Sequence, residues 1–287
     1  MNAAAPRSGL LQWIYRGYLL VFFLYLGAPL AAAGIFAFND SLFPTLPWNG
    51  FTLDWFFNDT EPKLGMFHDR RLLRGLENSF LIGVIVSALS VAAGTSNAFL
   101  FERKSFPGKG VLYLLMIVPL VIPGVILGIS ILVFASMIAN GVEDNLGYDW
   151  SVLRPGLVLV ILGQFSFLTT ITSLVIAARL RKFDVALEEA ALNLGATRLR
   201  VLLTITLPFL APALFSAFVL AFLVSFENFN TTLMLVGSEA PLTIVMYDRI
   251  AKAGSTPVLN AVSFFLMVGS GLLVLISALV QRQRDSE

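Results

Sequence analysis

The sequence of 287 residues contains no cysteine and a single histidine, His68. The absence of cysteine excludes disulfide bonds, thiolate metal sites and a cysteine nucleophile. One histidine cannot build a metal cluster, and His68 is predicted to lie on the surface of a loop. The sequence also lacks G-x-x-x-x-G-K-[ST], the motif that cradles nucleotide phosphates, so no ATP-binding site is predicted in this chain.

Charged residues are scarce as well, at 13%, whereas 57% of the residues are hydrophobic. This composition is typical of a protein embedded in a lipid bilayer. Six apolar runs reach the roughly 20 residues that a spanning helix needs. Their expected bounds are residues 17–38, 78–101, 111–138, 155–178, 208–236 and 256–280. The sequence predicts an all-α, polytopic transmembrane helical bundle that forms one domain over residues 1–287, and nothing indicates a nucleic-acid partner.

The distribution of positive charge predicts the orientation of the chain. If the first span runs outward, 12 of the 19 lysines and arginines fall on the cytoplasmic side. This bias follows the positive-inside rule and predicts that both termini are cytoplasmic. Arg70, Arg71 and Arg74 oppose it, because they fall in the expected outer segment 39–77, and a helix along the outer headgroups would accommodate them.

The third expected span contains Pro119, Pro123 and Gly124. A proline inside a helix removes a backbone hydrogen bond and predicts a kink at this point. Two interpretations stay open: the kink adjusts the helix to the bilayer, or it bends toward a pore.

One cytoplasmic segment, residues 184–208, carries an amphipathic helix. Leu187, Ala190, Ala191 and Leu194 recur at helical spacing and form a small apolar face, and Asp184 is placed to cap the helix start. Gly195 follows, where a positive φ would turn the chain out of the helix.

The spacing in this segment is Glu-Ala-Ala, three residues, Gly, nine residues, Ile-x-Leu-Pro. It resembles the signature loop of the permease subunits of ABC importers. The residues that match are Glu189, Ala190, Ala191, Gly195, Ile205, Leu207 and Pro208. The resemblance extends from Tyr15 to about Ile276 and is of the spermidine/putrescine type.

The resemblance implies a type I ABC importer permease fold in a bacterial inner (plasma) membrane. It implies that a second, different permease subunit, two ATP-binding subunits and an extracytoplasmic solute-binding protein complete the transporter. ATP and Mg would be bound by the partner ATPase, so this chain itself needs no cofactor. Segment 184–208 would be the coupling helix that docks on the ATPase. The coupling residues expected here are Glu188, Glu189, Ala190, Ala191, Leu194, Gly195, Ile205, Leu207 and Pro208.

A second set of residues lies near the end of the fifth apolar run and is expected to line the solute pathway. Glu227 is an acid beside apolar residues, and ionisable groups at membrane depth mark pathways or ligand sites. An interfacial acid in water is the alternative. Phe226 and Phe229 could flank a cation. The expected pathway set is completed by Asn228 and Gln164.

The substrate is less defined by the sequence. Polyamine permeases tend to carry an acidic pair at this point, and Asn228 replaces the second acid here. We therefore expect a polyamine-like solute, with an aminophosphonate, another amine or a ferric ion as alternatives.

The sequence argues against two other classes of protein. An intramembrane enzyme would need a base, a nucleophile or metal ligands within the spans, and the spans contain no such set, so no catalytic residue is predicted. An ATP-independent channel or secondary transporter would explain six spans but would leave the loop signature without a purpose.

Overall fold

The computed structural model describes residues 9–284, most of which lie in helices. Within these residues six helices are long and apolar enough to cross a membrane, which confirms the predicted all-α bundle of six spans. The two chain ends, whose cytoplasmic location the sequence predicts, lie outside the described residues. The chain divides into two compact units, one extending to Arg70 and including Arg249–Val268, the other formed by Arg71–Asp248 and the residues from Gly269 onward.

The first unit contains α1 (Gly9–Phe36), the short α2 (Asp54–Phe57) and the beginning of α12 (Pro257–Arg284). Its centre is an aromatic cluster in which the ring of Phe38 lies 5.1–5.3 Å from the rings of Phe51, Phe56 and Phe264. Such rings bury large apolar areas. The polar segment that follows α1 is therefore folded around an apolar centre.

Polar contacts fix the path of this segment. The indole N–H of Trp55 donates to the carbonyl oxygen of Asn39 at 2.9 Å, and Asn39 is itself fully buried. Lys63 forms ion pairs with Asp40 and Asp54. The hydrogen bond to Asp40 raises the pKa of Lys63 above its ordinary value.

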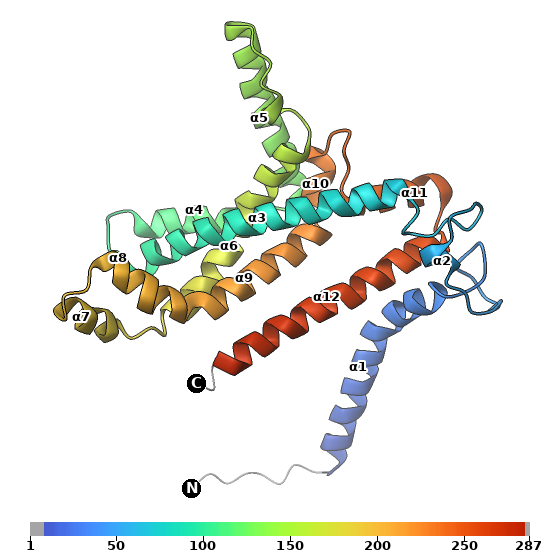
Figure 1. Ribbon diagram of the computed structural model, residues 1–287, viewed down its shortest axis with the longest axis horizontal. Coiled ribbons are helices and arrows are strands. Elements are labelled where there is room, and N and C mark those ends of the chain that lie inside the picture. Colours follow the sequence, from blue (N-terminus) through green and yellow to red (C-terminus); the bar gives the residue numbers. More distant parts are fainter. Residues whose placement is uncertain (1–8, 285–287) are drawn as a thin grey trace. The chain divides into compact units, whose positions relative to one another are not determined.

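The second unit contains the remaining helices, and Figure 1 shows α3, α4, α6 and α9 running alongside one another in it. The bounds are α3 (Arg70–Arg103), α4 (Lys109–Val121), α5 (Gly124–Leu146), the 3₁₀ turn η1 (Ser151–Leu153), α6 (Leu157–Leu180), α7 (Val185–Asn193), α8 (Arg198–Val201), the π-helical turn η2 (Leu202–Thr206), α9 (Leu207–Glu227), α10 (Asn230–Leu235) and α11 (Leu242–Ala253). Two buried apolar clusters stabilise the unit. One joins α3, α5, α6, α9 and α10, and the other joins α3, α6 and α9 near Phe183.

Small residues allow these helices to approach closely, as membrane helices require. A Cβ atom added at Gly94 of α3 would lie 2.4 Å from the hydroxyl oxygen of Thr172 in α6 and 2.9 Å from the backbone nitrogen of Ser173. The same Thr172 hydroxyl donates to the carbonyl oxygen of Ser90 at 2.6 Å. The α3–α6 contact therefore depends on a glycine at position 94.

Two expected spans are not single helices. Residues 111–138 are divided between α4 and α5, because Pro123 has no backbone N–H to donate and Ile122, at ψ 129°, is extended. The predicted kink is thus a complete break. Residues 208–236 are likewise divided, since α9 ends at Glu227 and α10 begins at Asn230.

The cluster of Arg70, Arg71 and Arg74, which opposes the positive-inside bias, lies at the start of α3. Arg71 forms an ion pair with Asp248 of α11, and nearby Arg249 pairs with Asp69 at 2.6 Å. Acidic side chains of the same chain therefore neutralise part of this positive charge.

We predict that Gly94→Ala destabilises the second unit by about 1–3 kcal/mol, because neither a buried hydroxyl nor a backbone nitrogen can move away from the added methyl group without disturbing the helix packing. The melting temperature of the purified protein in detergent would measure the loss. Gly110→Ala is the matched control, since a Cβ atom at that helical glycine meets nothing within 4 Å. Equal melting temperatures for the two variants would contradict the close α3–α6 contact.

Candidate functional site

The expected coupling segment begins with α7, and its start is capped as the sequence predicts. The carboxylate of Asp184 accepts a hydrogen bond from the backbone N–H of Ala186 at 2.9 Å. This contact satisfies one of the N–H groups that a helix start leaves without a partner. Asp184 therefore fixes where α7 begins.

The end of α7 depends on Gly195, whose φ of +88° confirms the predicted left-handed conformation. The N–H of Gly195 donates to the carbonyl oxygen of Leu192 at 2.9 Å, and that of Ala196 donates to Ala191 at 3.0 Å. A side chain at position 195 would meet no atom within 4 Å, so the backbone conformation alone selects glycine.

The apolar face expected on α7 is mostly uncovered by the residues that the structure describes. Leu194 is 90% exposed and Leu187 is 53% exposed. Further exposed large apolar side chains of the same segment are Val185, Leu192, Leu199 and Leu203. A group of exposed apolar residues of this kind marks an interaction surface.

The two consecutive acids of α7 have different surroundings. Glu189 is exposed, as expected for a residue that contacts a partner. Glu188 instead faces its own chain, where it pairs with Arg103 at 3.0 Å and accepts a hydrogen bond from the Thr206 hydroxyl at 2.6 Å. Glu188, which the sequence places among the expected coupling residues, thus contacts α3 and η2 of its own chain.

The helix after Gly195 begins earlier than expected. The Thr197 side chain caps it by accepting from the N–H of Arg200 at 3.3 Å, and the helix then continues from Arg198 to Glu227. Pro208 thus lies within this helix and does not open it. Because its ring would clash with the carbonyl group four residues earlier, the helix widens into η2, and the N–H of Leu207 bonds to Leu202 five residues back.

The expected pathway residues around Glu227 lie together at the break between α9 and α10. Glu227 is the last residue of α9 and is exposed. The ring of Phe226 lies 5.7 Å from that of Phe222, and the ring of Phe229 lies 4.9 Å from that of Tyr247. Both phenylalanines thus contact aromatic neighbours and are partly buried, whereas Glu227 is exposed.

Asn228 and Gln164 are joined in one hydrogen-bonded chain. The side-chain amide of Gln164 donates to the Thr232 hydroxyl at 2.9 Å, and Thr232 donates to Asn228 Oδ1 at 3.0 Å. Ser225 donates to the other end of the Gln164 amide. Gln164 is only 1% exposed, so its expected place along the pathway is corrected: it links α6 to α9 and α10.

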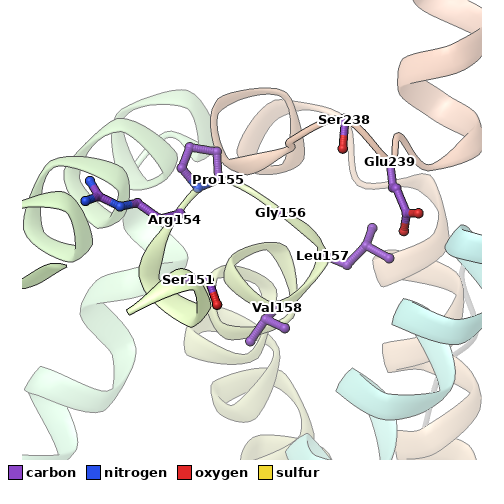
Figure 2. Close-up of a pocket in the computed structure, with 8 residues that line it drawn as sticks. All are labelled: Ser151, Arg154, Pro155, Gly156, Leu157, Val158, Ser238 and Glu239. Atoms are coloured by element: carbon purple, nitrogen blue, oxygen red, sulfur yellow. The ribbon is translucent and has the colours of Figure 1, made fainter. Parts of the chain in front are cut away.

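The structure also contains a small cavity of about 240 Å³ that no sequence pattern indicated. Figure 2 shows Arg154 and Glu239 on opposite sides of it, with backbone and small or apolar side chains between them. Arg154 already contacts Asn140 at 2.7 Å and pairs with Glu143 and Asp149. Its charge is therefore neutralised within the chain, and the other polar side chains that line the cavity are Ser151, Ser238 and Glu239.

Within the described residues, six helices long enough to span a membrane, with an exposed helix between the fourth and fifth of them, define a polytopic integral-membrane protein. The family described as "Binding-protein-dependent transport system inner membrane component" matches residues 78–285. The chain belongs to this family. It is a multi-pass inner-membrane permease of an ABC importer.

The curated relatives include two polyamine permeases of Escherichia coli (strain K12). The chain is 28% identical over 256 residues to the putrescine transport system permease protein PotI, covering 89% of this chain and 86% of PotI. It is 27% identical over 268 residues to the spermidine/putrescine transport system permease protein PotC, covering 93% and 94%. Among solved structures, a bacterial ABC transporter involved in the import of the acidic polysaccharide alginate superimposes with a TM-score of 0.72 at 20% identity, covering 94% of this chain and 96% of that chain.

We predict that Gln164→Leu lowers stability by about 1–2 kcal/mol and leaves solute selectivity unchanged, because two interhelical hydrogen bonds are lost at a site that no solute reaches. Melting temperature and competition between solutes would measure the two effects. Ser166→Ala is the control, since that hydroxyl bonds only to Gly163 in its own helix at 2.7 Å. A Gln164→Leu protein with parental stability and altered selectivity would return Gln164 to the pathway.

Proposed function

We propose that this chain is one of two permease subunits of an ATP-driven importer and forms half of the pathway for a small cationic solute of the polyamine class. An extracytoplasmic binding protein delivers the solute, and two ATP-binding subunits dock on the cytoplasmic loops 184–208 of the two permeases. Both termini of the chain are cytoplasmic. The observation that carries the proposal is the similarity to PotI and PotC over about nine tenths of the chain.

The surface of α7 supports docking of a separate ATPase. Leu187, Leu194 and Glu189 are exposed on a helix whose two ends are fixed by Asp184 and Gly195. An apolar centre with a polar residue beside it is the composition of a protein interface. Since the sequence has no nucleotide-binding motif, a partner chain would supply the ATPase.

The break after α9 supports a cationic solute. A carboxylate that follows an apolar helix attracts a cation more strongly than it would in water, because the surrounding dielectric constant is lower. The aromatic residues Phe226, Phe229 and Tyr247 beside Glu227 would add apolar contact for the methylene groups of a polyamine. Asn228 reduces the expected charge at this point to a single acid, which also fits a monoamine.

Purification of the native complex tests the proposal directly. The tagged chain is expected to retain an ATP-binding subunit and a second permease, and the partner binding protein is expected to carry an amine when its ligand is identified by mass spectrometry. An ATPase-free preparation that still transports would support a channel or secondary transporter instead. A binding protein that carries an aminophosphonate or a ferric ion would show that this ligand, and not a polyamine, is the solute.

We predict that Glu189→Lys and Gly195→Asp each abolish ATP-driven uptake while the protein still inserts at the parental level. The first reverses an exposed charge on the docking surface, and the second places a side chain at φ +88° and so alters the end of α7. Uptake, membrane level and the amount of co-purified ATPase are measured together.

Asp144→Lys is the matched control, because it makes the same charge change at an exposed position of α5. It is expected to retain the ATPase fully. Normal uptake in the Glu189→Lys protein would remove the coupling role of this loop.

We predict that Glu227→Gln weakens uptake of a cationic solute roughly 10- to 150-fold, the effect of losing one charge-assisted contact worth about 1.5–3 kcal/mol. Radiolabelled putrescine uptake by the complete complex would measure it, with ATPase activity in the absence of solute expected to be unchanged. Glu239→Gln removes the same charge from an exposed loop nearby and serves as the control. A change below about threefold for Glu227→Gln would identify an acid exposed to water and argue against contact with the solute.

A further inference from the structure

Three elements that are distant in sequence meet at the carboxylate of Glu188. Both terminal nitrogens of the Arg103 guanidinium donate to it, at 3.0 and 3.3 Å, and the Thr206 hydroxyl donates at 2.6 Å. Arg103 is the last residue of α3, Glu188 lies in α7, and Thr206 lies in η2. The first turn of the coupling helix is thus bonded to the cytoplasmic end of a spanning helix.

This contact is stronger than an ordinary surface ion pair. The side chains of Arg103 and Glu188 are each only 21% exposed, and the pair has the two-pronged geometry that fixes both groups. The positive charge also lies at the carboxyl end of α3, where the helix dipole stabilises it. The contact therefore resists displacement of α7 relative to α3.

Aromatic rings support Arg103 from another side. Its guanidinium lies 5.3 Å from the ring of Phe183, which packs against Phe209 at 5.1 Å, and Arg179 lies 4.4 Å from the Phe209 ring. Phe183 precedes α7, and Phe209 lies in the first turn of α9. Cations over aromatic faces gain further attraction, so the guanidinium is fixed from more than one direction.

The position of the third donor, the Thr206 hydroxyl, depends on Pro208 of the loop signature. Pro208 produces the π-helical turn η2, which inserts one residue relative to an α-helix and rotates the residues before it by about 100° with respect to α9. Thr206, fully buried, lies in that turn and bonds to Glu188. Pro208 thus connects the signature to the contact between α7 and α3.

The other end of α3 reaches the segment that follows the expected solute site. Asn78 donates to the carbonyl oxygen of Ala240 at 3.3 Å, and the hydroxyl of Ser79 accepts from the N–H of Leu242 at 2.9 Å. From Asn78 to Arg103 a continuous helix covers about 38 Å at 1.5 Å per residue. In α11, which begins at Leu242, Tyr247 contacts Phe229 beside Glu227. A single rigid element therefore contacts both the coupling loop and the region of the solute.

We infer that Arg103, Glu188 and Thr206 form a strut that transmits displacement of the coupling loop to α3, and through α3 to the outer segment 240–242. The inference rests on the proposed function, because it assigns positioning residues to the coupling of ATP hydrolysis to transport. Glu189 faces the partner and Glu188 faces α3. A displacement of the partner would therefore reach α7 at Glu189 and would reach α3 through Glu188.

The test uses the complete importer in proteoliposomes and compares solute transported with ATP hydrolysed. Glu188→Gln and Arg103→Gln are expected to retain the ATP-binding subunits and basal ATPase activity within about twofold, while the solute transported per ATP falls at least tenfold. Thr206→Val, which keeps the shape and removes the donor, is expected to lower this ratio by about threefold or more.

The matched control is Glu102→Gln. Glu102 pairs with Arg181 at 2.8 Å and so joins the same end of α3 to the end of α6 without touching α7. This variant is expected to keep the parental ratio. A purely structural role would predict equal effects from the Glu102 and Glu188 variants, so equal effects overturn the inference.

The remaining outcomes are also decisive. Parental coupling in Glu188→Gln overturns the strut, and loss of the ATPase from that variant overturns it by making Glu188 a docking residue. If Glu188→Gln and Arg103→Gln fail to fold, the ratio measured for Thr206→Val decides, and a parental ratio there overturns the strut. Absence of ATP-dependent uptake in the parental complex would instead contradict the proposed function.

Discussion

A backbone N–H or C=O group in the hydrocarbon core of a bilayer must find its hydrogen-bond partner within the protein. Helices satisfy this requirement, and each break in a helix needs a substitute partner. Near the break between α4 and α5, the Thr231 hydroxyl donates to the carbonyl oxygen of Gly124 at 3.2 Å and so joins α10 to the first turn of α5. At the break between α9 and α10, Asn228 Oδ1 accepts from the N–H of Thr232 at 3.2 Å. The two breaks are connected, because Gly124 in the first turn of α5 packs against Asn230 and Thr231 of α10.

Close packing explains why both breaks are stable. A Cβ atom at Gly128 would lie 2.9 Å from the carbonyl oxygen of Thr231, so α5 approaches the backbone of α10 directly. Gln164 then ties α10 to α6 and α9 through Thr232 and Ser225. The arrangement fixes the backbone on both sides of Glu227, the last residue of α9.

The sequence predicts those features that follow from local chemistry or from length. Apolar runs of spanning length identified the six helices, and Asp184 and Gly195 correctly marked the two ends of α7. The sequence does not predict contacts between helices that are distant along the chain. A proline in a long apolar run predicts a disturbance, yet Pro123 breaks its helix whereas Pro208 only widens one. The difference depends on whether neighbouring turns can rearrange their bonds. Gln164 illustrates the same limit, because a polar residue in a span has the same sequence pattern whether its side chain faces a solute or another helix.

The two acids of the loop, Glu188 and Glu189, show how contacts within the chain bear on function. Consecutive residues of a helix point about 100° apart, so Glu188 and Glu189 face different surroundings. Periodicity alone cannot say which of them faces inward, because both belong to the polar side of α7. Arg103 determines which acid faces inward, because a partly buried guanidinium needs a carboxylate and Glu188 lies within reach of it. The inward acid leaves Glu189 exposed beside the apolar residues of α7. The signature loop thus combines an exposed apolar surface with an anchor to a spanning helix, and the proposed mechanical link between subunits needs both.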